Sequence, residues 1–287
     1  MKLIRLFILI GCVTILSGCS RSSDSLLCQI EGKPFSGLYP LIEDSTKTTK
    51  VMMVHGVAKH EPGYSSQLLD RLANEMGLNH VSEITKNIAL TDPVDTTKEL
   101  GNLRIRRLTN EDKSHELLFY ELTWSIINDA RKKILAYDMS GDYSFHRAFV
   151  NEKIKRVTND FIPDQMLYVG EQRQDILISF SQGFCWMVSK EWDDLPVTGK
   201  QACGVAELVE SVEVMQKSHY AFISHSLGSR IVIDGLQRIA KMSSNKEDER
   251  MKLISKKADR FMQEFQQLRV PIFMLANQLP LFQLGRN

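Results

Sequence analysis

The chain has 287 residues, of which 43% are hydrophobic and 25% are charged, so it can bury the core of one large globular domain or of at most two small ones. This composition excludes an intrinsically disordered or fibrous protein. The formal net charge of +1 at pH 7 gives no general electrostatic reason to expect a nucleic-acid partner.

The N-terminal segment has the order of a secretion signal. Lys2 and Arg5 precede an apolar run at residues 6–16 that is too short to span a bilayer comfortably. The run ends in the sequence LSGC at residues 16–19, which resembles the bacterial lipoprotein signal motif. A signal anchor, or an ordinary signal peptide that contains a cysteine by chance, is the alternative.

The lipoprotein resemblance implies that Cys19 is lipidated and that residues 1–18 are removed, which takes away Lys2 and Arg5 and changes the formal charge from +1 by 2 to −1. Several acyl chains hold a protein on a membrane where one chain does not, so a membrane is the expected partner. Ser20 follows the cysteine. By analogy with enteric bacteria, this favours the outer membrane, with the domain facing the periplasm.

Three cysteines, Cys28, Cys185 and Cys203, lie beyond the signal. An exported chain meets an oxidising compartment, so the sequence is compatible with one disulfide among them. Spacing favours the pair Cys185 and Cys203. Three buried thiols are the alternative.

Composition predicts a tether followed by a domain. Residues 19–48 are rich in serine, glycine, aspartate and threonine, as expected of a segment that leads from a membrane to a domain at 49–287. The domain opens with an apolar run at Lys50–Val57, which is typical of a fully buried strand in a parallel sheet.

A helix and two strands follow. Ser65 or Ser66 is expected to cap the helix, which ends near Gly77. Leu103–Leu108 predicts a half-exposed strand and His115–Thr123 a more buried one.

From about residue 124 to 200 the apolar spacing becomes helical, and Ile176–Val188 predicts a helix that is apolar on most sides. This segment is interpreted as a helical insertion. It would either cap a site above the sheet or only pack against the rest of the domain. Val205–Met215 predicts another helix, a long amphipathic helical region extends to about Gln267, and Val270–Leu275 predicts a final buried strand.

One short stretch carries the strongest functional signal. Tyr220–Ile223 suits a buried strand, and after the turn at Ser226 apolar residues recur at near-helical spacing. In the nucleophile elbow of serine hydrolases, small residues two before and two after the serine let such a turn close. Here these residues are Ser224 and Gly228, so the usual first glycine is replaced by serine.

A second feature agrees with the first, because a His-Gly pair, His55 and Gly56, directly follows the first buried strand. On Val51–Tyr64 and Tyr220–Gly235 together, the chain resembles the α/β-hydrolase superfamily in its esterase and lipase branch. The resemblance covers residues 49–287. It implies an α/β fold with a mostly parallel sheet and flanking helices, and hydrolysis of carboxylic or lipid esters.

The same resemblance implies roles for single residues. Ser226 would be the nucleophile, and an oxyanion hole would be formed by the backbone N–H of Leu227 and one from Gly56 or Val57. The resemblance implies no cofactor. No two of His80, His115, His146 and His219 have metal-ligand spacing, so a metal site is not expected, and no glycine-rich phosphate loop is present in the sequence.

The base and the acid of a triad are missing where the family carries them. The family order is nucleophile, acid, histidine, yet the 287 − 226 = 61 residues after Ser226 contain no histidine. This predicts that the sheet lacks its last strands. His60 is the candidate surrogate base, whereas His55 is expected to orient the oxyanion loop and His225 to serve packing. Asp234 lies on a predicted helix and is expected to be a surface residue rather than the acid of a triad.

Three interpretations therefore remain. The chain is a shortened hydrolase with a broken triad, or it draws its base from elsewhere and is an active, lipid-anchored serine hydrolase. The third is a lipoprotein that keeps the scaffold as a binding or structural module without catalysis. A lipoprotein with an unrelated helical fold is a further alternative. It would require that the serine turn and the His-Gly pair both occur by chance.

Overall fold

The computed structural model describes residues 35–81, 84–136, 149–204, 207, 211–241 and 259–277. The lipoprotein motif with Cys19, and the expected tether up to residue 34, lie outside this part of the chain. The described strands are β1 (Thr48–Val54), β2 (Asn79–His80), β3 (Lys86–Thr91), β4 (Glu99–Thr109), β5 (Glu116–Thr123), β6 (Thr198–Gln201), β7 (Ser218–His225) and β8 (Ile272–Leu275). The described helices are α2 (Tyr39–Ile42), α3 (Ser66–Glu75), α4 (Ile126–Ala136), α5 (Phe149–Val169), α6 (Arg173–Ser189), α8 (Val212–Gln216) and α9 (Leu227–Lys241), with a further helix at 259–267.

The strands form one mixed sheet in the order β6-β3-β4-β5-β1-β7-β8, and β2 pairs with β4. β1 lies between β5 and β7 and is parallel to both, and β8 continues this parallel half at the edge. In the other half β4 is antiparallel to β3 and β5, and β6 is parallel to β3 at the far edge. The expected α/β class with a mostly parallel sheet and flanking helices is therefore present.

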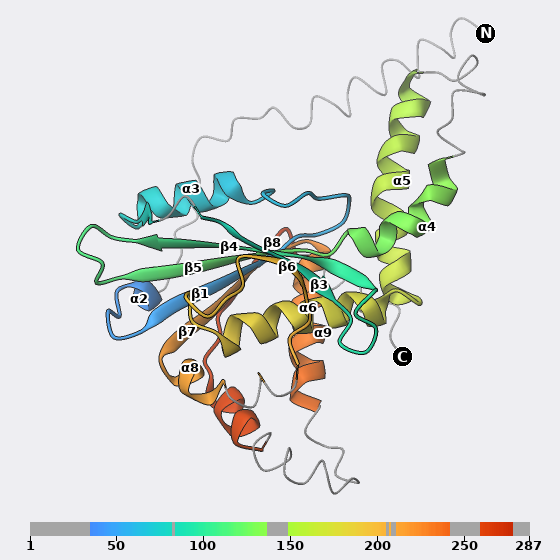
Figure 1. The fold of residues 1–287 in the computed structure, drawn as a ribbon. Helices are drawn as coiled ribbons and strands as arrows, with labels where there is room; N and C mark the ends of the chain where they lie inside the picture. The colour runs from blue at the N-terminus through green and yellow to red at the C-terminus, as the bar shows by residue number, and fades with distance from the viewer. Residues whose placement is uncertain are drawn as a thin grey trace, which may run out of the picture. The chain divides into compact units, whose positions relative to one another are not determined.

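Alternation along β1 builds two cores. Met52 and Val54 pack into the larger hydrophobic cluster, whereas Val51 and Met53 pack into the smaller one on the other face. α6 and α9 cover the first face and α3 covers the second, as the ribbon shows (Figure 1). A strand buried on both faces by helices accounts for the continuous apolar run in the sequence.

The helical segment expected at about 124–200 is helical only in part. α6 has buried residues on most sides, as predicted, and it packs flat on the sheet rather than over a site, with Gly183 facing Met52, Leu103 and Leu122. The same segment also contains β6, which the sequence did not predict because its four residues TGKQ are polar and exposed.

Three details of the fold differ from the sequence-based expectation: where the compact unit begins, how far the last strand is buried, and how α3 begins. The compact unit begins at Gly37 rather than at residue 49, because Leu38 and Ile42 of α2 are buried against the sheet. β8 is a half-exposed edge strand rather than a buried one. Ser65 precedes α3 but does not cap it, since its hydroxyl donates to Glu121 in β5 instead. Within the described residues, no helix is both long and apolar enough to cross a membrane.

Cys185 in α6 and Cys203 after β6 form a disulfide across a sequence separation of 18 residues. A cross-link of this loop length removes conformational entropy from the unfolded chain worth about 3 kcal/mol. It ties the edge of the sheet at β6 to the helix that covers the larger core.

We expect the double variant Cys185→Ala, Cys203→Ala to lower the free energy of unfolding by about 3 kcal/mol, measured by chemical denaturation of the full chain. Dithiothreitol should shift the unfolding midpoint of the wild type and leave that of the variant unchanged. A wild type insensitive to reduction would contradict this role of the cross-link.

Candidate functional site

The carboxyl ends of the parallel strands gather the residues that the sequence singled out. The segment after β1 carries Gly56 and Val57, the turn after β7 carries Ser226, and β5 leads into Trp124 and Ser125. Because β1, β5 and β7 are parallel neighbours, these segments meet at one edge of the sheet. Open α/β sheets bind ligands at this edge.

Ser226 is the turn between β7 and α9, as the sequence predicted. Its φ of 50° lies in the left-handed region, which a residue other than glycine rarely adopts. Its N–H donates to Leu275 O over 2.9 Å, which fixes the turn against β8. The side chain is 5% exposed, and its hydroxyl has no hydrogen-bond partner among the described residues.

Two glycines allow this turn to sit directly against the end of β1. A Cβ on Gly228 would lie 2.3 Å from Val54 O and 2.6 Å from His55 O. A Cβ on Gly56 would lie 2.8 Å from the Cβ of Ser226. All three separations are shorter than non-bonded atoms tolerate, so a side chain at either glycine would push the two segments apart.

Ser224 stands where the pattern usually has a glycine. Its side chain is completely buried, and its hydroxyl is hydrogen-bonded to that of Ser229 in the first turn of α9 over 3.0 Å. The serine hydroxyl therefore links the strand to the helix across the turn. The departure from Gly-x-Ser-x-Gly fits within the packing around Ser226.

Two of the residues predicted to supply backbone donors lie next to Ser226. Leu227 is the first residue of α9, and N–H groups in the first turn of a helix have no acceptor within it. Gly56 packs against Ser226 from the segment after β1, and Val57, the next residue, is 8% exposed. The structure therefore places Leu227 and Gly56 next to Ser226, and an oxyanion hole formed by their N–H groups stays a prediction.

Side chains from three other elements hold the segment after β1. Asp164 of α5 is fully buried and accepts the Ala58 N–H over 2.7 Å, and Lys132 of α4 forms an ion pair with it over 2.7 Å. Ser125 accepts the His60 N–H over 3.2 Å. Glu121 of β5 accepts the N–H of Ser65 over 2.8 Å. Ala58 has a φ of 79°, which these contacts maintain.

Asp164 and Glu121 could not be identified from the sequence, because each contacts a segment that is distant in the chain. An acidic residue in a polar helix, or alternating with apolar residues in a strand, is ordinarily a solvated one. Burial and the hydrogen bonds to the backbone single them out only in the folded chain.

His55 has a structural role, as expected. Its Nε2 accepts the Trp124 N–H over 3.2 Å, so the proton resides on Nδ1, which donates to Gly56 O over 2.8 Å. Complete burial, with the nearby ring of His60, holds the pKa of His55 well below 6.5. A neutral ring therefore orients the Gly56 peptide.

His60 stacks on His55 with ring centroids 4.2 Å apart. Its Nδ1 donates to Ala58 O over 3.0 Å, which leaves Nε2 as the basic nitrogen. Partial burial is the main cause that lowers the pKa of His60 below 6.5. His60 is thus a neutral base at pH 7, and it lines a cavity of about 300 Å³ beside Ser125 and Thr123.

Two sequence-based expectations about neighbouring residues were wrong. His225, expected to be packed, is exposed. Asp234, expected on the surface of α9, is 3% exposed, and its carboxylate accepts hydrogen bonds from Tyr168 over 2.8 Å and from Arg173 over 2.9 Å. These bonds connect α9 to α5 and α6. They engage the Asp234 carboxylate with Tyr168 and Arg173 rather than with a histidine.

The described residues contain no group of three or more histidine, cysteine, aspartate or glutamate side chains that could hold a metal ion. Comparisons with protein-family models, with curated proteins and with solved structures found no match for this chain.

We expect Gly228→Ala to lower the free energy of unfolding by about 1–3 kcal/mol, because the new methyl group would meet Val54 O and His55 O. Gly183→Ala is the matched control, since it is also a buried helical glycine, but its Cβ would meet Met52 and Leu103 at 3.4 and 3.5 Å. This control should be neutral or more stable by up to about 1 kcal/mol. Equal losses in thermal unfolding would refute the close-approach argument.

Asp164→Ala should cost about 3–5 kcal/mol, because it removes the carboxylate that pairs with Lys132 and accepts the Ala58 N–H in a buried position. Asp175→Ala breaks an exposed pair with Lys98 and should cost less than about 1 kcal/mol. Urea denaturation of both variants measures the difference. A loss of similar size in both would mean that Asp164 does not anchor the segment.

Proposed function

We propose that this chain is a membrane-anchored serine hydrolase of the α/β-hydrolase type, which cleaves carboxylic or lipid esters through an acyl-enzyme on Ser226. The observation that carries the proposal is the positive φ of Ser226 at a strand-to-helix turn on the carboxyl edge of the sheet. Such strain at a serine is costly, and it is typical of a nucleophile held out toward a substrate.

The arrangement around the serine supports the same chemistry. The Oγ of Ser226 would bond to the ester carbonyl carbon while its proton passes to Nε2 of His60. The carbonyl oxygen, now an oxyanion, would accept the N–H of Leu227 and that of Gly56 or Val57. The ester C–O bond then breaks, the alcohol leaves with the proton, and water releases the carboxylic acid.

Two features of the segment after β1 favour preorganised donors. The segment is fixed by buried or half-buried partners, Asp164, Ser125 and Glu121, so its N–H groups would not need to reorganise during the reaction. His55, held neutral between Trp124 and Gly56, keeps the Gly56 peptide in place.

The anchor is part of the proposal. The LSGC motif at residues 16–19 supports lipidation of Cys19, and the pair Cys185 and Cys203 suits an exported protein on the outer membrane, facing the periplasm. A membrane location would bring lipid esters within reach of Ser226.

A second candidate is a hydrolase-like lipoprotein that binds a partner or ligand without catalysis. It is favoured by the Ser226 hydroxyl, which contacts no histidine by hydrogen bond among the described residues. No acidic side chain accepts a hydrogen bond from His60 there either, so its ring lacks the orienting partner of a complete triad.

A fluorophosphonate probe tests the proposal, because it labels only activated serines. The purified full chain should be labelled, and Ser226→Ala should abolish labelling. His60→Ala should reduce the rate by about 100-fold or more, whereas His225→Ala is the control for an adjacent histidine and should have little effect.

The base must be neutral to accept a proton, and burial lowers the pKa of His60 below 6.5. The labelling rate should therefore rise with pH through a midpoint below pH 6.5 and level off at higher pH. Absence of labelling in folded wild type would establish the non-catalytic alternative. Unchanged labelling in His60→Ala would assign the base to another group.

A further inference from the structure

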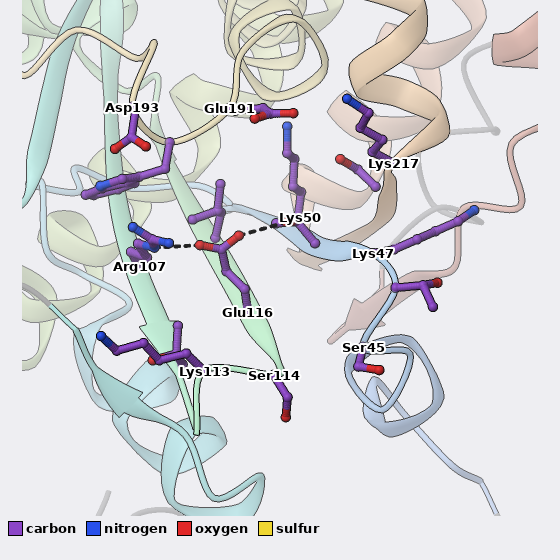
Figure 2. A pocket seen from close by; sticks show the side chains of 16 residues that line it. Ser45, Lys47, Lys50, Arg107, Lys113, Ser114, Glu116, Glu191, Asp193 and Lys217 are labelled. Atoms are coloured by element: carbon purple, nitrogen blue, oxygen red, sulfur yellow. Dashed lines mark hydrogen bonds and ion pairs between the residues drawn. The ribbon is translucent and has the colours of Figure 1, made fainter. Parts of the chain in front are cut away.

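A polar cavity lies at the end of the sheet opposite Ser226. It has a volume of about 370 Å³ and is lined by Thr48 and Lys50 at the start of β1, Glu116 at the start of β5 and Ser218 at the start of β7 (Figure 2). Since these parallel strands all begin here and end at the serine turn, this cavity is separate from the site proposed for ester hydrolysis.

The charges that line the cavity do not balance. The basic lining residues are Lys47, Lys50, Arg107, Lys113 and Lys217, and the acidic ones are Glu116, Glu191 and Asp193. Five positive and three negative charges leave 5 − 3 = +2. The whole chain has a formal charge of only +1, so the excess is local to this cavity.

One of the acidic residues is already neutralised within the protein. Arg107 Nε donates to Glu116 Oε1 over 2.5 Å, and the Thr48 hydroxyl donates to Glu116 Oε2 over 2.8 Å (Figure 2). By contrast, Lys47, Lys113 and Lys217 form no ion pair with any described carboxylate. They come from three separate segments, which precede β1, join β4 to β5 and precede β7.

Lys50 places a positive charge in the inner wall. It is 1% exposed, and its ammonium donates to Met187 O over 3.0 Å and to Lys190 O over 2.8 Å, at the end of α6. An ammonium has three N–H groups, and the third has no hydrogen-bond acceptor among the described residues. Burial lowers the pKa of Lys50 to about 8, so it remains charged at pH 7.

Burial of the Lys50 ammonium is costly even with the carboxylates of Glu191 and Glu116 near it, and the lysines at the rim add to the repulsion. An anion in the cavity would offset both. A phosphate monoester carries a charge of about −1.5 to −2 and three acceptor oxygens, which matches the excess of +2 and the free N–H of Lys50. A carboxylate would neutralise only half of this excess.

The remaining lining residues suit a small polar organic group esterified to the phosphate. Thr109, Ser218 and Trp192 also line the cavity, so its walls include hydroxyl-bearing residues and an aromatic one. We propose that this cavity is a second binding site, for the phosphate group of a small phosphomonoester.

Isothermal titration calorimetry of the purified full chain tests the proposal with three probes at constant ionic strength: glycerol 3-phosphate, inorganic phosphate and glycerol. We expect both phosphates to bind and glycerol not to bind, with affinity falling as sodium chloride is added. Tighter binding of glycerol 3-phosphate would identify an organic ester, such as a lipid headgroup, as the ligand. Equal affinities would identify free phosphate.

Variants at the rim keep the test independent of folding. Lys113→Gln and Lys217→Gln replace exposed side chains, and each should raise the Kd for phosphate about five-fold, the effect of losing one cation near the anion. Lys200→Gln, an exposed lysine on β6 outside the cavity, is the matched control and should leave the Kd unchanged. Lys50→Met should abolish binding if the variant folds.

No heat with either phosphate, or equal effects of Lys200→Gln and Lys217→Gln, would overturn the proposal. Ser226→Ala should bind phosphate as the wild type does, so failure of the ester-hydrolase proposal leaves this result unaffected.

Discussion

The structure depends on one close approach, that of the turn at Ser226 to the end of β1. It requires hydrogen atoms in place of side chains at Gly56 and Gly228, since a Cβ at either would overlap Ser226 or the carbonyls of Val54 and His55. With these two segments in contact, a strained serine, the first N–H of α9 and the segment after β1 share one small volume. Neither glycine would be significant without the other.

The contact between the Ser226 turn and the end of β1 depends on parts of the fold that are distant from it. β1 is buried on both faces. α6 covers the larger core and is cross-linked by its disulfide to the segment after the edge strand β6. The segment after β1 has a backbone conformation that costs free energy at Ala58, and buried acidic residues such as Asp164 offset this cost through hydrogen bonds. The core thus provides the stability, and the carboxyl edge of the sheet concentrates the strain.

The two ends of the parallel strands differ in their chemistry. The carboxyl edge carries a strained serine and neutral histidine rings, an environment suited to moving a proton and stabilising a transient negative charge. The amino edge carries lysines, among them the buried Lys50, and suits binding of a permanent anion.

The sequence by itself determined the local features. Apolar runs predicted β1 and β7, the Ser-His-Ser-Leu-Gly stretch predicted the turn, and small residues marked where two segments could meet, because these properties depend on neighbours along the chain. Only the tertiary structure decided that Asp164 holds Ala58, that His225 is exposed and that Asp234 is buried. Those outcomes depend on which distant elements pack together, and a polar side chain has the same sequence signal whether it is solvated or paired in the core.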